Sequence, residues 1–489
     1  MKLRTNVPKS FAPFSQTVHP DLKEECGVCG VYAHRQSAHL VYLGLTALQH
    51  RGQESAGIVS FNGKMNRHVG MGLVFDVFKE EHFKFLKGRS AIGHVRYSTT
   101  GSSVLKNAQP ILVTTHYGQV AVGHNGNFTN ADTLRKELES SGAIFQTTTD
   151  SEVILHLIAR SKEKTLPEAI VSALKKVEGA YSLLFASDRN SHGRQESMMI
   201  AVRDPMGFRP LILGRIGSSW AIASETCAFD LIGAKTVREI EPGEMIVIEG
   251  SQTFRSVPIS KPLGRTAFCI FEFIYFARPD SKIFGKSVYE VRRELGRQLA
   301  REAPPPRGVD CVVAVPDSSV LAAMGYAEEV QLPYELGFIR SHYVGRTFIE
   351  PSKPMRDFQA RIKYNPISEN LRGKKVVLID DSIVRGTTSK KLIRLLRSTG
   401  VKEIHMRISS PPITGSCFYG IDTPNKSELI ASSHSVEGIR KFLKVESLKY
   451  LSIPGLLKSA RGTTSKYCTG CFSGNYPTRL LDLEKSSKC

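Results

Sequence analysis

Short apolar runs and amphipathic stretches recur along the chain, and their order changes near its middle. Up to about residue 260, runs such as MMIAVRD (198–204) and EMIVIEG (244–250) are typical of strands, while TLRKELESSG (133–142) and SEVILHLIARSKE (151–163) are typical of helices. Beyond this point strands and helices alternate in the α/β manner. The polar, proline-containing stretch SVPISKPLGRT (256–266) predicts a link between two large domains.

The stretch VVLIDDSIVRGTT (376–388) carries the most informative pattern in the second part of the chain. Its apolar start, Val376 to Ile379, favours a buried parallel strand. Asp380 and Asp381 then follow at the carboxyl end of that strand, where open α/β sheets place their ligands. Two adjacent carboxylates at this point can hold sugar hydroxyls and a hydrated Mg²⁺. An ordinary strand whose acidic pair caps the next helix is the alternative for so short a pattern.

A seat for a phosphate group follows the two carboxylates. Gly386 permits a tight turn, and Thr387, Thr388 and Ser389 offer hydroxyls and N–H groups at the start of a helix, whose amino end favours an anion. The helix continues through KKLIRLLRSTG (390–400). The whole string resembles the signature of type I phosphoribosyltransferases, which bind 5-phosphoribosyl 1-pyrophosphate (PRPP). The resemblance adds Ser382 and Arg385 to the expected PRPP site.

A second set of motifs lies near the amino terminus. They are EECGVCGVYAH around Cys26, LQHRGQESAGIV (48–59), GHVRYSTTG (93–101), GHNGNFTN (123–130) and TTTDSE (147–152). Their order resembles class II glutamine amidotransferases, which are N-terminal-nucleophile hydrolases. In that chemistry the α-amino group of a terminal cysteine serves as the base for its own thiol. The resemblance therefore implies that residues 1–25 are a propeptide and that Cys26 is the nucleophile.

The resemblance also assigns roles within these motifs. Arg96 is expected to clamp the glutamine carboxylate with Thr99 nearby, and Asp150 to hold the glutamine ammonium. Asn125 and the N–H of Gly126 are expected to form an oxyanion hole. Arg51 is grouped with the glutamine-side residues, where it either orders the nucleophile's loop or forms a structural ion pair.

Cysteines are sparse, with nine in 489 residues, which argues against a disulfide framework and for a reducing, cytoplasmic location. Four of them have flanks similar to those of a structural 4Fe-4S cluster in one branch of the family: Cys269, Cys417, Cys468 and Cys471. Four thiolates suit zinc as well, and the resemblance alone favours iron–sulfur. Cys227 and Cys311 are predicted to be buried and inert. Cys29 stands where relatives carry an apolar residue.

Two further segments complete the expected PRPP side. The strand-and-turn CVVAVPDSS (311–319) implies that Ser319 lies beside the metal. After the strand-like LPYELGFIR (332–340), the basic stretch 343–365 is similar to a mobile lid, in which Arg346 is the expected pyrophosphate contact. Other basic residues of this stretch are solvated surface charges in the simpler interpretation: Lys353, Arg356, Arg361 and Lys363.

Charge suggests a competing function. Lys and Arg exceed Asp and Glu by 66 − 46 = 20, which would also suit a PRPP-sensing regulator that binds DNA or RNA. The positive residues are dispersed and no nucleic-acid-binding signature is present, so we expect no nucleic acid partner. The chain also lacks an apolar span long enough for a membrane helix, so we expect no membrane association. Glutamine-dependent transfer to a sugar or to aspartate would lack the 376–388 motif.

Taken together, the motifs resemble the amidophosphoribosyltransferase family over nearly all of residues 26–480. The implied fold is α+β and α/β, an αββα N-terminal-nucleophile hydrolase sandwich (26–260) followed by a type I phosphoribosyltransferase parallel-sheet domain (261–489) with a cluster-binding segment. The implied activity converts PRPP and glutamine to 5-phosphoribosylamine, with ammonia passing between the sites. Mg²⁺ and a 4Fe-4S cluster are the implied cofactors. A homotetramer and purine nucleotide inhibitors are also implied.

Overall fold

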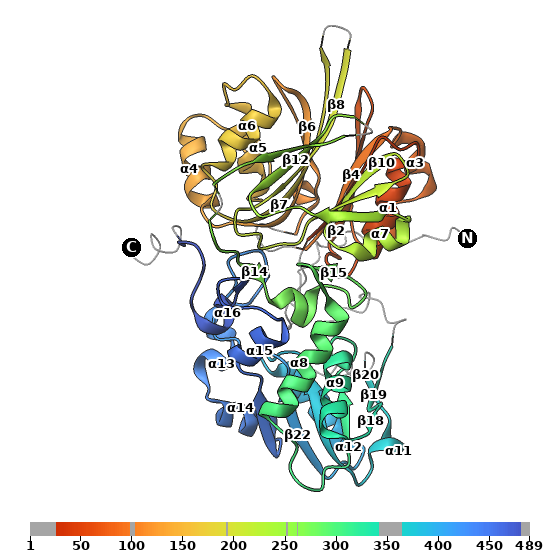
Figure 1. Cartoon of the computed structure of the whole chain (residues 1–489), viewed down its shortest axis with the longest axis vertical. Coiled ribbons are helices and arrows are strands. Elements are labelled where there is room, and N and C mark those ends of the chain that lie inside the picture. Colours follow the sequence, from red (N-terminus) through yellow and green to blue (C-terminus); the bar gives the residue numbers. More distant parts are fainter. Residues whose placement is uncertain are drawn as a thin grey trace, which may run out of the picture.

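The computed structural model describes residues 26–97, 103–191, 194–250, 253–261, 263–341 and 364–480. Two lobes follow one another along the long axis of the molecule, with a narrower region around β14 and β15 between them (Figure 1). We call the lobe formed by β1 to β13 the first half, and the lobe formed from β14 onward the second half.

Two antiparallel sheets form the centre of the first half, as the alternating patterns in its sequence predict. One has the order β11 (Lys235–Glu239), β9 (Ile212–Ile216), β10 (Ser219–Ala223), β1 (Gly27–Tyr32), β4 (Ser90–Arg96), β2 (Ser55–Phe61) and β3 (Met65–Met71). The other has the order β13 (Arg255–Pro258), β12 (Glu244–Ile248), β8 (Arg194–Arg203), β7 (Gly179–Ser191), β6 (Gly118–Phe128) and β5 (Ile111–Thr115).

Three apolar clusters hold the layers of the first half together. Between the sheets, side chains of β1 and β4 such as Val28 and Ile92 pack against side chains of β7 such as Leu184. Helices α1 (Ser37–Ala47), α2 (Val74–Val77), α3 (Glu80–Phe85) and α7 (Thr226–Ile232) cover the outer face of the β1 sheet. Helices α4 (Ala131–Ser140), α5 (Ser151–Ala159) and α6 (Leu166–Leu174) cover the other (Figure 1). The predicted αββα sandwich is confirmed.

A parallel five-stranded sheet forms the centre of the second half. Its order is β18 (Tyr334–Glu335), β17 (Cys311–Ala314), β21 (Lys375–Asp380), β22 (Glu403–Ile408) and β23 (Ser447–Tyr450). Val376 and Leu378 of β21 face α12 (Thr387–Ser398) and α14 (Val436–Leu443). The alternate residues Val377 and Ile379 face α8 (Val288–Glu302), α9 (Val320–Val330) and α15 (Ile453–Ser459). Burial on both faces explains the unbroken apolar run, and the predicted parallel-sheet domain is confirmed.

The remaining elements are short. They are η1 (Leu105–Asn107), β14 (Phe268–Cys269), the π-helix η2 (Glu272–Phe276), β15 (Lys282–Ile283), β16 (Lys286–Ser287), β19 (Phe338–Arg340), β20 (Tyr364–Pro366), α11 (Ser368–Leu371), η3 (Lys426–Glu428), α13 (Ile430–Ser433), β24 (Tyr467–Cys468) and α16 (Gly470–Ser473). Across the described ranges, none of the helices is both long and apolar enough to cross a membrane.

One predicted strand is wrong in its extent. The segment LPYELGFIR forms two short strands, β18 and β19, which belong to different sheets. The break falls at Gly337, where a Cβ atom would lie 2.3 Å from Cγ1 of Val313. The chain bends there because its backbone packs directly on β17.

Candidate active sites

Cys26 immediately precedes β1, in the middle of the first sheet. The pairing of Gly27 with Val95 of β4 brings the cysteine beside Arg96 and Tyr97. Its side chain is buried, and Sγ lies 3.5 Å from the carbonyl oxygen of Tyr97. Burial raises the pKa of the Cys26 thiol to about 11, although the Tyr97 hydrogen bond and the charge of Arg96 act in the opposite direction. The thiol is therefore protonated near neutral pH unless a base acts on it.

Arg51 lies beneath Cys26 and is almost fully buried. Its Nε donates to the carbonyl oxygen of Cys26 at 3.1 Å. Its Nη1 donates to Glu225 at 2.5 Å, and its two terminal nitrogens lie 3.0 and 2.7 Å from the oxygens of Glu272. Burial opposes the ionisation of Glu225, but the charges of His50 and Arg51 outweigh it and lower the pKa of that carboxyl. Arg51 thus forms a buried ion-pair network and also bonds to the backbone of Cys26, so its contacts fit both interpretations.

The segment at the end of β6 carries Asn125 and Gly126. Asn125 is 1% exposed, and neither its Oδ1 nor its Nδ2 has a hydrogen-bond partner among the described residues. Gly126 has φ +147°, and a Cβ atom there would lie 2.1 Å from the carbonyl oxygen of Ala180. Only glycine fits this backbone. A buried amide without partners is costly, so this one is available for a ligand.

Asp150 and Glu152 stabilise the turn before α5. Asp150 accepts from the N–H of Phe128 at 2.9 Å and lies 3.5 Å from Nδ1 of His124. Burial alone would raise the pKa of Asp150, but His124 and the hydrogen bonds outweigh it and lower that pKa. Glu152 accepts from the N–H groups of Gln146 and Thr147 at 2.8 and 2.7 Å. Asp150 is thus held as a carboxylate on the β6 side of the turn.

In the second half, the carboxylate pair lies at the carboxyl end of β21, as predicted. Asp380 and Asp381 are each 7% exposed. Ser319 is fully buried and its hydroxyl donates to Asp380 at 3.2 Å, while Ser318 donates to Asp381 at 2.5 Å. The hydroxyl of Ser382 donates to the other oxygen of Asp381 at 2.6 Å. Two carboxylates and several hydroxyls at one sheet edge form a donor set that suits Mg²⁺.

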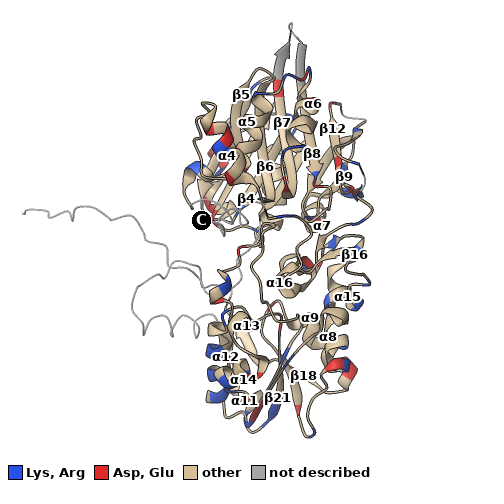
Figure 2. Cartoon of the chain, turned by 90° about the vertical axis from the view of Figure 1, so that its left-hand side faces the viewer, with Lys and Arg blue, Asp and Glu red and all other residues tan. Residues whose placement is uncertain are grey.

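The predicted phosphate seat forms the start of α12. Gly386 has φ +72° and precedes the first turn, which contains Thr387, Thr388 and the buried Ser389. Arg385 forms an ion pair with Glu428 at 2.5 Å. Lysine and arginine residues recur along α12 and α14 (Figure 2). A multiply charged anion is therefore favoured on this side of the second half.

Strands from the start and from the end of the second half bring two of the four cysteines with cluster-like flanks together. Cys269 of β14 and Cys468 of β24 are partners in a parallel strand pair. Burial raises the pKa of Cys471 well above its ordinary value, and Cys417, Cys468 and Cys269 raise it further. In the part of the chain that the structure describes, no group of three or more His, Cys, Asp or Glu side chains is placed so that it could hold a metal ion.

Several predicted residues lie outside the described ranges. They are the propeptide 1–25, Thr99, and the lid residues Arg346, Lys353, Arg356, Arg361 and Lys363. Cys227 and Cys311 are buried, as predicted. Cys29 is fully buried and packs against α1, where a Cβ atom on Gly44 would lie 2.4 Å from its Sγ.

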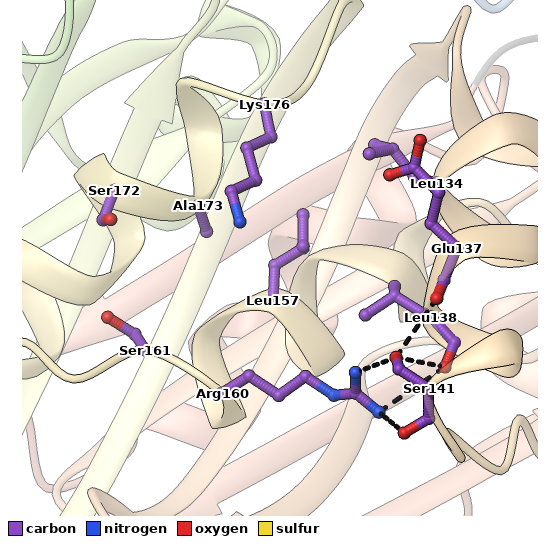
Figure 3. A pocket seen from close by; sticks show the side chains of 10 residues that line it. All are labelled: Leu134, Glu137, Leu138, Ser141, Leu157, Arg160, Ser161, Ser172, Ala173 and Lys176. Atoms are coloured by element: carbon purple, nitrogen blue, oxygen red, sulfur yellow. Dashed lines mark hydrogen bonds between the residues drawn. The ribbon is translucent and has the colours of Figure 1, made fainter.

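A pocket of about 250 Å³ lies between α4, α5 and α6 (Figure 3). The Arg160 guanidinium on its rim already donates to the hydroxyl and the carbonyl oxygen of Ser141. Lys176 points into the opening from the other side (Figure 3). Because the pocket shares no residue with either motif set, we assign it no part in the chemistry.

Comparison with known proteins identifies two family models in the chain. A glutamine amidotransferase domain matches residues 94–230, and a phosphoribosyl transferase domain matches residues 286–409. The chain is 50% identical to the chloroplastic amidophosphoribosyltransferase of Glycine max over 94% of this chain and 80% of the relative. It is 47% identical to the amidophosphoribosyltransferase of Bacillus subtilis over 94% of this chain and 95% of the relative.

A solved structure is similar over both lobes. The glutamine phosphoribosylpyrophosphate amidotransferase from B. subtilis, complexed with ADP and GMP, matches with a TM-score of 0.86 at 46% identity. The match covers 93% of this chain and 98% of that one. Both halves and their order are therefore shared with this protein.

Acid should selectively remove the stabilising effect of Glu152. Its hydrogen bonds outweigh burial and lower its pKa from 4.5 to about 2, so the stabilisation is complete above the unfolded pKa and is lost as the pH falls towards 2. We expect Glu152→Gln to unfold at a lower temperature than wild type at pH 7, with a difference that narrows between pH 5 and pH 3. Thermal unfolding of both proteins across this pH range measures the difference in unfolding temperature.

Glu139→Gln is the control, because Glu139 forms only a 3.8 Å surface pair with Arg135 and its loss should change the unfolding temperature little. A pH-independent gap for Glu152→Gln would contradict the prediction.

Proposed function

The chain belongs to the amidophosphoribosyltransferase family, and on this premise we propose how its residues divide the reaction. The enzyme converts glutamine, water and PRPP to glutamate, 5-phosphoribosylamine and pyrophosphate, the first step of purine biosynthesis. The first half releases ammonia from glutamine, and the second half transfers it to PRPP. The observation behind this division is that Cys26 and Asn125 are both buried in the first half, whereas Asp380 and Asp381 lie at a sheet edge of the second half.

In the first half, we assign the nucleophile to Cys26. Its thiolate attacks the glutamine amide carbon, and the resulting oxyanion accepts from Nδ2 of Asn125 and the N–H of Gly126. Ammonia leaves, and water hydrolyses the thioester to glutamate. Because burial raises the thiol pKa to about 11, a local base is needed. Removal of residues 1–25 would supply it as the α-amino group of Cys26. Arg96 and Thr99 would hold the glutamine carboxylate, and Asp150 its ammonium group.

In the second half, Asp380 and Asp381 would hold the ribose hydroxyls and, with Ser319, a hydrated Mg²⁺. Bound Mg²⁺ neutralises charge on the pyrophosphate. The first turn of α12, Gly386 to Ser389, would seat the 5-phosphate, and Arg346 would contact pyrophosphate. Ammonia then forms a bond to C1 while the bond from C1 to pyrophosphate breaks, and the nitrogen loses a proton. Passage of ammonia inside the protein keeps it from being protonated by water.

For the four cysteines, we propose the structural 4Fe-4S cluster. Cys269, Cys417, Cys468 and Cys471 would supply the four thiolate ligands that such a cluster takes. The group would add folding stability rather than chemistry. A reducing compartment such as the cytoplasm would favour it. The ADP and GMP bound to the B. subtilis relative support purine nucleotides as inhibitors of this enzyme, and we propose that it works as a homotetramer.

Cys26→Ala should abolish glutamine-dependent synthesis and leave ammonia-dependent synthesis largely intact, because the acceptor site lies in the other lobe. Parallel rate measurements with glutamine and with ammonium salt test this. Cys29→Ala is the matched control, since it removes a buried thiol three residues away and should retain both activities. Equal loss of both activities in folded Cys26→Ala protein would refute the assignment.

Asp381→Asn should bind PRPP with Mg²⁺ at least about tenfold more weakly, because a charge is lost with little change of shape. Both glutamine- and ammonia-dependent synthesis should fall together. Titration calorimetry measures the affinity. Asp310→Asn is the control, because Asp310 accepts from the N–H of Lys375 at the opposite end of β21. Unchanged PRPP affinity in Asp381→Asn would remove this site from consideration.

Protein purified without oxygen should be brown and contain iron and acid-labile sulfide. Cys471→Ser should lose both and unfold at a lower temperature, whereas Cys311→Ser, also buried but in β17, should keep its iron. Elemental analysis and visible absorbance make the comparison. A colourless, zinc-containing and fully active wild-type enzyme would argue against the cluster.

A further inference from the structure

Glu272 is a charged residue from the second half whose partners come from the first half. It starts the π-helix η2 and is fully buried. One of its oxygens lies 2.7 Å from Nη2 of Arg51 and 3.5 Å from Nη1 of Arg209, and the other accepts from Nη1 of Arg51 at 3.0 Å. Two guanidinium groups from the first half thus surround one carboxylate from the second half.

Arg51 bonds both to Glu272 and to the backbone of the proposed nucleophile, Cys26. The guanidinium that pairs with Glu272 also donates from Nε to the carbonyl oxygen of Cys26, at 3.1 Å. A guanidinium is planar, so its bonds to Glu272, together with its bond to Glu225 of the first half, fix the direction of its Nε–H group. The backbone of Cys26 is consequently held against a group that the other lobe supplies.

A second contact between the two halves lies at residues 125–127 of β6, which include the proposed oxyanion hole and which we call the oxyanion segment. Residues 417–420 of the second half, which we call the Cys417 loop, run along the end of β6. Nδ2 of Asn127 donates to the carbonyl oxygen of Phe418 at 3.1 Å, and Arg209 donates to that of Tyr419 at 3.0 and 2.6 Å. Gly420, with φ +103°, is so close that an added Cβ atom would lie 2.9 Å from the Cα and carbonyl carbon of Gly126.

We propose that Glu272 and Gly420 are positioning residues of the glutamine site, contributed by the phosphoribosyltransferase half. Glu272 sets the backbone of Cys26 through Arg51, and Gly420 sets the backbone of Gly126 by direct packing. The inference rests on the proposed roles of Cys26 and Gly126. It adds that the amidotransferase half alone does not define the geometry of its own active site.

Hydrolysis is sensitive to such positioning. An oxyanion hole works through donors fixed where charge develops, and loss of one donor costs roughly 10²- to 10³-fold in rate. A displacement of about 1 Å can cost about 10²-fold. Shifts imposed by Glu272 or Gly420 therefore act on glutamine hydrolysis, whereas ammonia supplied from solution bypasses the glutamine site.

The test uses Glu272→Gln and Gly420→Ala in the full-length enzyme. Each should lower the kcat of glutamine-dependent synthesis by about tenfold or more, with ammonia-dependent synthesis within about twofold of wild type. Labelling of Cys26 by a glutamine-like diazoketone should slow in parallel.

Matched controls separate positioning from general damage. Glu244→Gln also removes a buried carboxylate bonded to two nitrogens of one arginine, Arg238, within the first half. Gly474→Ala also adds a Cβ at positive φ, +75°, but into open space. Both should keep the wild-type ratio of glutamine- to ammonia-dependent rates.

Equal loss of both activities in Gly420→Ala, or an unchanged ratio, would overturn the proposal, even where Glu272→Gln fails to fold. The Cys26→Ala result remains separate. If Cys26→Ala removes only the glutamine-dependent rate while Gly420→Ala changes neither, the proposed function stands and this inference fails. If Cys26→Ala keeps the glutamine-dependent rate, the proposed function itself fails.

Discussion

The carboxylate of Glu272, enclosed by Arg51 and Arg209, is the interaction on which the arrangement of the two lobes depends. All three side chains have essentially no exposure to solvent. A buried ion pair adds little net stability, but removing one partner leaves an uncompensated charge at a cost of about 3–5 kcal/mol. Arg51 and Arg209 belong to the first half and Glu272 to the second, so this ion-pair group joins the two lobes directly. Arg51 also keeps a carboxylate partner of its own half, Glu225.

The π-helix that carries Glu272 is held from its other side by Arg292 of α8. Arg292 is buried and donates to the carbonyl oxygens of Phe273, Tyr275 and Ala277. Burial lowers the pKa of Arg292 to about 10, and the charge of Asp381 is the largest influence in the opposite direction. The five residues of η2 are thus bonded to Arg51 of the first half through Glu272 and to Arg292 of α8 through backbone carbonyls.

Local patterns predicted most of the fold and the residues that define each motif. The apolar run 376–379 and the pair Asp380–Asp381 are local features, and β21 extends that run by one residue at each end. Hydrogen-bond partners distant in sequence were not predicted. Ser318 and Glu225 acquire their roles only when segments more than 60 residues apart meet.

Glu272 did leave a signal in the sequence. It is the single charged residue within the apolar run CIFEFIYF (269–276). A lone carboxylate in such a run must be buried with a partner, because burial of an unpaired charge is prohibitive. That argument predicts a cationic partner, but it cannot identify Arg51 or Arg209, which lie more than 60 residues away in another domain.

The close approach of Gly420 to Gly126 constrains how this enzyme can be recombined. Two backbones meet there without side chains between them, so a transplanted acceptor domain would need a glycine at the same point and a loop of the same path. A graft that matched the surface charges alone would push the oxyanion segment aside. Gene fusion or domain shuffling would therefore have to preserve this backbone contact as well as the ion pairs between the lobes.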